Sequence, residues 1–432
     1  MNVRFDGPGG RSGGREAPIE APGRFEDEGR CGTQSDVPRF EPFAGLRYDP
    51  SVPLDAVIAP PYDVVGPEER AELARRHRAN AIHVELPVED RPAGLDRYEH
   101  AAALLRSWID EGIVLRDAAP AFYAYRMTAP GGDRTSGVIG ALGCEPIGGD
   151  ILPHEQTIPK DKSDRLSLLR ACHANLSPIW GLSLTDGLSI LYQQTGPPLA
   201  TATDDTGVVH ELWVIDDPAT VDAISLSVGS SPVVIADGHH RYETALAYQA
   251  ERRAAREGAR GDHDFVMALV VELAPDQLTV RPIHRMITGV PESADVVKAF
   301  GAWFDTVHAG PADEQVVGAV AESDALALIT SRDVWLLTPR EQAYEAAGSD
   351  LDSSVVALAV DGIPGASTEY HHDWRTVVST VIAGSADAAV LLRPVTVRQI
   401  GEWAHARRRM PPKSTYFHPK PRTGMVFRSV ED

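Results

Sequence analysis

The sequence has few cysteines and no long apolar run, and each absence excludes a class of protein. The three cysteines, Cys31, Cys144 and Cys172, form no C-x-x-C pair, so neither a disulfide framework nor a thiolate zinc site is expected. No run of about 18 uncharged apolar residues is present, and the N-terminus lacks the basic start and apolar stretch of a signal peptide. We therefore expect a cytoplasmic protein without a membrane-spanning helix.

Positive charge is also scarce. The 62 acidic residues outnumber 41 basic ones and give a formal net charge of −21. A field of that sign repels nucleic acid and anionic membrane surfaces, so we expect neither as a partner. It does not exclude a small anionic ligand, which local Arg, Lys and backbone N–H groups can hold. No feature of the sequence indicates an oligomeric state.

The 432 residues are enough for two or three domains. Residues 1–37 are rich in Gly, Arg, Glu, Asp and Pro without apolar periodicity, which predicts a disordered tail. Helical and strand patterns alternate through the remainder, and no flexible linker interrupts residues 40–432. We expect an α+β fold with a mixed-sheet body, divided into an N-terminal region (38–204), a core (205–290) and a C-terminal region (291–432) packed with the rest.

Several elements follow from apolar spacing and turn residues. Two β-rich segments, 122–127 and 136–142, flank Gly131-Gly132-Asp133 and predict a hairpin. Apolar residues at helical spacing predict a long helix that ends near Gly112. Alternating or apolar stretches predict strands at 82–86, 189–194 and 280–286.

The segment Asp237-Gly238-His239-His240-Arg241 follows a buried strand over 232–236 and precedes a helix. This order directs the free N–H groups of the first helical turn at one point, which favours an anion site. Gly238 allows close backbone approach, and Arg241 can grip a phosphate with two hydrogen bonds. Asp237 could hold Mg²⁺ or accept a hydroxyl proton. The alternative is an N-cap aspartate beside surface histidines.

Two further segments could reach the same ligand. His154 and Glu155 lie within a charged stretch with Lys162 and Arg165, where the cations could neutralise a transferring phosphoryl group and Glu155 could act as a base. The alternative is a solvated loop that leads into a helix capped by Ser163. Lys413-Ser414-Thr415 pairs a lysine with hydroxyls, but Met410-Pro411-Pro412 stand where a phosphate loop needs glycines. His284 and Arg285 end a predicted strand and could face the pocket.

Several motifs together resemble an uncharacterised prokaryotic family called domain of unknown function 1015. The resemblance spans roughly residues 38–428. It is carried, in chain order, by segments 59–64, 153–155, 162–166, 175–179, 236–245, 282–285 and 410–420. The family has no settled activity, so the resemblance marks these segments as a site without naming a reaction.

The Gly-His-His-Arg element (Gly238 to Arg241) is also similar to the phosphate-gripping segment of ParB/sulfiredoxin-like folds. Sulfiredoxins carry a cysteine where this chain has His239, so a sulfinic-acid reductase is not expected. The free-serine kinases of that superfamily hold a nucleotide and use acidic residues to activate the serine hydroxyl. The resemblance therefore implies a ParB/sulfiredoxin-like core, phosphate binding at Gly238, His239 and Arg241, and an acidic role for Asp237.

These observations lead to one functional expectation with two alternatives. We expect a nucleotide-dependent phosphotransferase that uses Mg²⁺ with ATP or ADP and acts on a small hydroxyl metabolite such as serine. In that scheme Asp237 or Glu155 takes the hydroxyl proton. His154, Lys162, Arg165, His240, His284, Arg285, Lys413, Ser414 and Thr415 help to bind phosphate. The alternatives are a non-catalytic nucleotide sensor and a phosphatase that uses the same pocket.

Overall fold

The computed structural model describes residues 37–90, 92–156, 163–194, 196–292 and 294–431. The tail expected over residues 1–37 lies almost entirely outside this part, as do Cys31 and Lys162. Helices and mixed β-sheets alternate along the described chain, so the α+β, mixed-sheet fold is confirmed.

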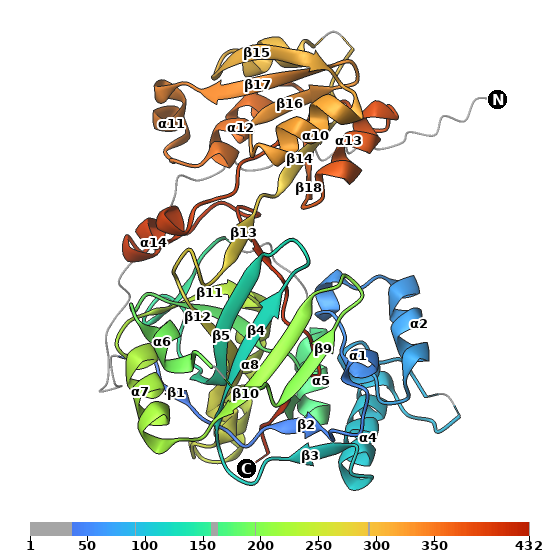
Figure 1. Ribbon diagram of the computed structural model, residues 1–432, viewed down its shortest axis with the longest axis vertical. Helices are drawn as coiled ribbons and strands as arrows, with labels where there is room; N and C mark the ends of the chain where they lie inside the picture. Colours follow the sequence, from blue (N-terminus) through green and yellow to red (C-terminus); the bar gives the residue numbers. More distant parts are fainter. Residues whose placement is uncertain (1–36, 91, 157–162, 195, 293, 432) are drawn as a thin grey trace, which may run out of the picture.

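A nine-stranded sheet forms the centre of the larger lobe (Figure 1). Its order is β6-β11-β8-β12-β5-β4-β10-β9, and β1 pairs with β5. Most pairs are antiparallel, but β11 runs parallel to β6 and β12 runs parallel to β8. The strands are β1 (Phe40–Glu41), β4 (Phe122–Thr128), β5 (Arg134–Gly143), β6 (Ile151–Pro153), β8 (Ile179–Ser183), β9 (Ala200–Thr203), β10 (Val209–Ile215), β11 (Val233–Asp237) and β12 (Phe265–Glu272).

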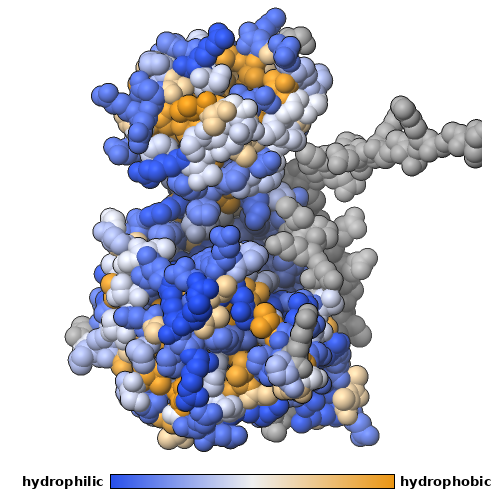
Figure 2. Space-filling view, turned by 90° about the vertical axis from the view of Figure 1, so that its right-hand side faces the viewer, coloured by the Kyte–Doolittle hydropathy of each residue, from blue (hydrophilic) through white to orange (hydrophobic). Residues whose placement is uncertain are grey.

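A six-stranded sheet forms a second, smaller lobe (Figure 1), and a narrower neck joins the two lobes (Figure 2). Its order is β15-β17-β16-β19-β14-β18. The strands are β14 (His284–Thr288), β15 (Phe304–Pro311), β16 (Ala327–Thr330), β17 (Asp333–Pro339), β18 (Ser367–His371) and β19 (Ala388–Leu391). Its helices are α9 (Val296–Phe300), α10 (Glu314–Glu322), α11 (Glu341–Ala347), α12 (Asp352–Asp361) and α13 (Trp374–Ile382).

The chain returns to the larger lobe through α14 (Val397–His405). Short strand pairs hold this return: β20 (Tyr416–His418) pairs with β13 (Thr279–Arg281), and β21 (Arg428–Ser429) pairs with β7 (Ala174–Asn175). The chain thus leaves the larger lobe, forms the smaller lobe and returns to the larger one. Strands from both sides of residue 204 share the nine-stranded sheet, and the domain boundaries at 204 and 290 stay predictions.

Different parts of the chain cover the two faces of the nine-stranded sheet. On one face, α6 (Leu188–Tyr192), α7 (Pro218–Gly229) and α8 (His239–Ala255) pack over Phe122 and Ala124. On the other face, the C-terminal segment packs Trp403, Met410 and Phe417 into the core. The C-terminal segment therefore approaches the ends of the strands that carry the candidate site.

The remaining elements gather beside the larger sheet as a helical layer with its own buried core. They are β2 (Leu46–Tyr48), β3 (Val114–Arg116), α1 (Leu54–Val57), α2 (Pro67–Arg76), α3 (Ile82–Glu85), α4 (Arg97–Asp110) and α5 (Ser163–Cys172), with a 3₁₀ turn at Tyr62–Val64. A second 3₁₀ turn, at Asp262–Asp264, links α8 to β12. The predicted long helix is confirmed as α4. Asp96 and Glu99 form its capping box.

The predicted hairpin is confirmed, whereas three predicted strands are wrong. Residues 82–85 form helix α3, because the buried Asn80 side chain accepts a hydrogen bond from Ile82 N (2.9 Å) and turns the chain. Residues 188–192 form α6, because the Glu272 carboxylate accepts from Ser189 N (2.6 Å) at its start. The strand expected over 280–286 is two strands in different lobes. They are separated at Pro282, which has no N–H to donate.

A buried charge cluster fastens the C-terminal segment to the larger sheet. Arg422 Nε donates to Asp204 Oδ2 (2.8 Å), and His210 Nε2 lies 3.0 Å from the same oxygen. The other ring nitrogen of His210 lies 2.8 Å from the Tyr125 hydroxyl. Arg422 and His210 hold the pKa of Asp204 well below its usual range, although burial opposes them.

We expect Asp204→Asn to lower the free energy of unfolding by about 2–3 kcal/mol, because the buried Arg422 loses its counter-charge. The urea midpoint measures this loss. Asp205→Asn is the control, since the Asp205 side chain is 49% exposed and pairs only with Arg76 at the surface. Equal midpoints for the two variants would contradict the structural role of the cluster.

Among the described residues, no helix is long and apolar enough to cross a membrane.

Cys144 and Cys172 are buried free thiols, and burial raises the pKa of each to about 12.

Candidate functional site

The candidate site begins where β11 ends and α8 starts. Val233 to Ala236 are buried, and Asp237 is the last residue of the strand. Gly238 has a φ of +85°, a left-handed conformation that favours glycine. A Cβ atom at this position would lie 3.0 Å from Arg241 Nε, so the absence of a side chain also lets the guanidinium pack against the turn.

The start of α8 has no side-chain cap. Gly238 occupies the N-cap position, and the helix has no side-chain cap hydrogen bond within the described residues. Asp237 is therefore not an N-cap aspartate. The first-turn N–H groups of this 17-residue helix point outward with the positive end of the helix dipole, which is the geometry of an anion site.

Asp237 is paired with two cations. Lys420 Nζ donates to Oδ1 (2.8 Å) and Arg241 Nη2 donates to Oδ2 (3.0 Å). Burial alone would raise the pKa of Asp237, but the charges of Lys420 and Arg241 outweigh it and hold that pKa well below its usual range. Asp237 is thus an ionised anchor that positions the two cations and is a weak proton acceptor.

His239 faces into the site with an unused nitrogen. Its side chain is 8% exposed, and Nε2 has no hydrogen-bond partner among the described residues. Burial, reinforced by the charge of His154, lowers the pKa of His239 to about 4, so the ring is neutral at pH 7. Arg241 Nε, two residues further along the same helix, is also buried without a partner in the described part of the chain. Both nitrogens are available to a ligand.

His154 joins the second predicted segment to this point. Its ring centroid lies 5.2 Å from that of His239. Nδ1 lies 2.8 Å from the Ile235 carbonyl, which can only accept, so Nδ1 carries the proton. Nε2 lies 2.9 Å from the Thr415 hydroxyl. His154 bridges β11 and the C-terminal segment.

Glu155 lies beside His154. Its Oε2 accepts from Ser414 N (3.3 Å) and lies 3.4 Å from His154 Nε2. Burial would raise the pKa of Glu155, but His154 and the Ser414 N–H lower it below its usual value. The Ser414 hydroxyl donates to Pro411 O (2.7 Å), so this hydroxyl stabilises its own turn.

A second branch of the site leads from Arg241 to α3 and α5. Arg241 Nη1 donates to Ser177 Oγ (3.2 Å) and to the Pro178 carbonyl, and Ser177 Oγ donates to Glu85 Oε1 (3.2 Å). Arg165 lies 3.9 Å from the same Glu85 oxygen and packs over the Tyr62 ring.

Glu85 differs from the other two carboxylates. Burial raises the pKa of Glu85 above its usual value, although Arg165 and Arg241 oppose this shift. Glu85 also lines a cavity of about 60 Å³ with Arg165, Ser177 and Arg241. It is therefore a buried carboxylate beside a small space, and its pKa is raised where those of Asp237 and Glu155 are lowered.

The other predicted residues lie at the edge of this arrangement or outside it. His240 is turned toward Glu243 on the helix surface (3.4 Å), and the Lys413 side chain is exposed. His284 Nδ1 accepts from Leu392 N (3.1 Å) within the smaller lobe. Arg285 donates to the Lys413 carbonyl (3.0 Å), which joins the smaller lobe to the edge of the site. Lys162 lies outside the described residues.

The structure thus brings together Asp237, Gly238, His239, Arg241, His154, Glu155, Ser414 and Thr415, with Arg165 on the second branch. Sequence reasoning missed Lys420, Glu85 and Ser177. Lys420 and Ser177 lie inside motifs that were identified, but only geometry shows which side chains point inward. Glu85 carried no signal, because its segment was assigned to a strand.

Comparisons with known proteins place this geometry in a family. A family model described as "Protein of unknown function (DUF1015)" matches residues 40–355. No curated protein matches the chain.

Several solved structures align with this chain at low identity. A conserved hypothetical protein from Pyrococcus furiosus is 13% identical, with 64% of this chain and 90% of that chain covered and a TM-score of 0.32. A free serine kinase in complex with AMP is 12% identical, with coverage of 65% and 88% and a TM-score of 0.34. C-terminally truncated SbnI from Staphylococcus aureus is 12% identical, with coverage of 67% and 86% and a TM-score of 0.36.

Likenesses this distant carry no conclusion about ligand or activity. The family match is different, because it extends over most of the chain from the first strand of the larger sheet into the smaller lobe. The chain belongs to the DUF1015 family.

Proposed function

We propose that this protein binds the phosphates of ATP or ADP at the start of α8 and transfers a phosphoryl group to a hydroxyl of a small metabolite. One observation carries the proposal. At the uncapped start of a long helix, His239 Nε2 and Arg241 Nε are buried and have no protein partner among the described residues. Buried donors normally find acceptors, so an anion that approaches Gly238 would accept hydrogen bonds from these two nitrogens.

The reaction we propose needs little covalent participation by the protein. The substrate oxygen attacks the terminal phosphorus, the bond from that phosphorus to the bridging oxygen breaks, and the nucleotide leaves one phosphate shorter. The hydroxyl proton goes to a carboxylate. Asp237 and Glu155 were expected in this role, but the low pKa of each makes it a weak base. Glu85 suits it better, because its pKa is raised and it lines a space beside Arg241.

Mg²⁺ does not fit the position expected for it at Asp237. Both oxygens of Asp237 already accept hydrogen bonds from Lys420 and Arg241, which a metal ion would have to displace. Among the residues that the structure describes, no three acidic, His or Cys side chains group as ligands. We therefore assign the neutralisation of phosphate charge to Arg241, Lys420 and the helix start.

The sensor alternative has one observation in its favour. Asp237 was expected to be catalytic, but it is ionised and held by two cations. This arrangement suits a site that binds its ligand without reacting with it. Binding of nucleotide without transfer to any hydroxyl acceptor would support this alternative.

The test is transfer from ATP or ADP to L-serine, followed by ³¹P NMR for a phosphate monoester. L-Serine is chosen because of the resemblance to free-serine kinases. We expect Glu85→Gln to lower the rate by about 10²-fold or more, within the usual range for loss of a general base, with little change in nucleotide affinity. Glu72→Gln is the control, since the Glu72 side chain is 61% exposed. A full rate in Glu85→Gln would remove Glu85 from the mechanism, and a wild type that binds no nucleotide would overturn the proposed function.

A further inference from the structure

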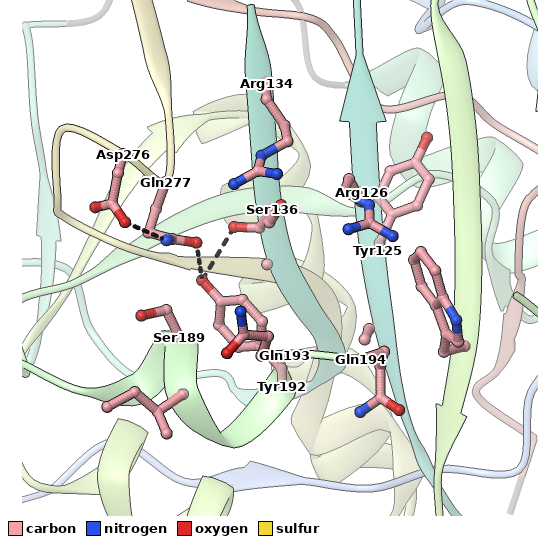
Figure 3. A pocket seen from close by; sticks show the side chains of 14 residues that line it. Tyr125, Arg126, Arg134, Ser136, Ser189, Tyr192, Gln193, Gln194, Asp276 and Gln277 are labelled. Atoms are coloured by element: carbon pink, nitrogen blue, oxygen red, sulfur yellow. Dashed lines mark hydrogen bonds between the residues drawn. The ribbon is translucent and has the colours of Figure 1, made fainter. Parts of the chain in front are cut away.

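A separate polar pocket opens beside α6, at the end of the face that α6 and α7 cover (Figure 3), and none of its lining residues belongs to the candidate site. Its volume is about 260 Å³, which holds on the order of nine waters at the liquid volume of each. Strands β4, β5 and β10, the end of α6 and the turn before β13 supply its walls. Nothing in the proposed phosphoryl transfer uses these residues.

The pocket walls are fixed by hydrogen bonds. The Tyr192 hydroxyl donates to the Ser136 carbonyl (3.1 Å) and toward Gln277 Oε1 (3.4 Å), as Figure 3 shows. Gln277 Nε2 in turn donates to Asp276 (2.8 Å). Tyr192 is 4% exposed and Trp213 is 6% exposed, so both belong to the core and hold the pocket open. The shape therefore exists before any ligand arrives.

Two arginines and one carboxylate line the pocket, and the carboxylate, Asp276, accepts a hydrogen bond from Gln277. Arg126 packs over the Trp213 ring at 4.5 Å and donates to Glu211 (2.9 Å), so its charge is balanced. Arg134, at the start of β5, lines the pocket. Its side chain has no hydrogen-bond or ion-pair partner among the described residues. Gln193, Gln194 and Ser189 add amide and hydroxyl groups close by (Figure 3).

We propose that this pocket is a second ligand site, for a small hydroxylated metabolite that bears a carboxylate or a phosphate monoester. The anionic group pairs with the guanidinium of Arg134, whose planar fork matches both headgroups. The hydroxyls of the ligand meet the side chains of Ser189, Gln193 and Gln194, which can each donate and accept. The pocket shares no lining residue with the α8 site, so its ligand is distinct from the nucleotide proposed there.

The test uses two probes, glycerol 3-phosphate and L-malate, added separately to ¹⁵N-labelled protein. Trp213 provides a local signal, because its indole N–H lies beside the pocket and donates to Gly196 O (2.9 Å). We expect at least one probe to shift that resonance saturably. The probe that does so identifies the headgroup as phosphate or carboxylate.

Arg134→Gln should weaken the effective probe by at least about tenfold, the effect of a lost charge-assisted hydrogen bond. Arg134→Lys should weaken it less, since the charge remains and only the fork is lost. Arg116→Gln is the matched control, another exposed arginine at a strand end, on β3, and should bind as wild type does. If neither probe shifts Trp213, or if Arg134→Gln and Arg116→Gln bind equally, the proposal is overturned.

Discussion

Arg241→Ala is expected to lower the affinity for ADP by roughly ten- to a hundredfold, which corresponds to about 1.5–3 kcal/mol for hydrogen bonds to a charged group. Arg241 Nε is buried beside Gly238 without a partner, so a phosphate at the helix start would gain this donor. Isothermal titration calorimetry gives the affinity directly.

Two further variants separate ligand binding from structure. Arg241 also supports Asp237 and Ser177, so a loss of affinity in Arg241→Ala has to be compared with its unfolding midpoint. Arg241→Lys keeps the charge but loses the planar fork, and we expect intermediate affinity. His240→Ala changes a neighbour turned toward Glu243 and should bind ADP normally. Unchanged affinity in a folded Arg241→Ala would contradict phosphate binding at this helix start.

Lys420→Met is expected to lower the free energy of unfolding by about 2–3 kcal/mol at pH 7. The loss follows because Asp237 keeps its charge but has only one cation left. This value lies below the usual range for breaking a buried pair, since the Asp237 side chain is 21% exposed. The losses in Asp237→Asn and Lys420→Met should not add in the double variant, because each change alone already removes the same Asp237–Lys420 interaction. Additive effects of the two changes would contradict the pairing.

The dependence on pH gives a second check of the same pair. The folded-state pKa of Asp237 lies below its ordinary value of 3.8, so its contribution to stability is present above that value and is lost as pH falls toward the folded pKa. Wild-type stability should therefore fall below about pH 4, and Lys420→Met should fall less steeply. Identical slopes would show that Lys420 does not lower the pKa of Asp237.

Local patterns predicted the elements whose causes are local. The β4–β5 hairpin followed from its glycine turn, α4 from its apolar spacing and β11–α8 from a buried strand followed by a glycine. One of the three failures had a distant cause. The start of α6 depends on the Glu272 carboxylate, which is 83 residues from Ser189 in the chain. No window around Ser189 contains that information.

The candidate site was predicted as segments rather than as side chains. Family motifs marked the stretches that include His154, Asp237 and Lys420, and the structure brings these stretches together. Asp237 was expected to act as a base or metal ligand because its partners could not be seen. The pairing with Lys420 spans 183 residues, so only the folded chain shows that this carboxylate is neutralised.

The most direct measurement follows the ring of His239 while ADP is added. Long-range ¹H–¹⁵N spectra of histidine-labelled protein, assigned with His239→Gln, report on each ring nitrogen. We expect the Nε2 resonance of His239 to shift saturably with ADP, and the pKa of His239, about 4 in the free protein, to rise as the phosphate arrives. ADP that saturates the protein without moving the His239 resonance, or that does not bind, would contradict a phosphate site at the start of α8.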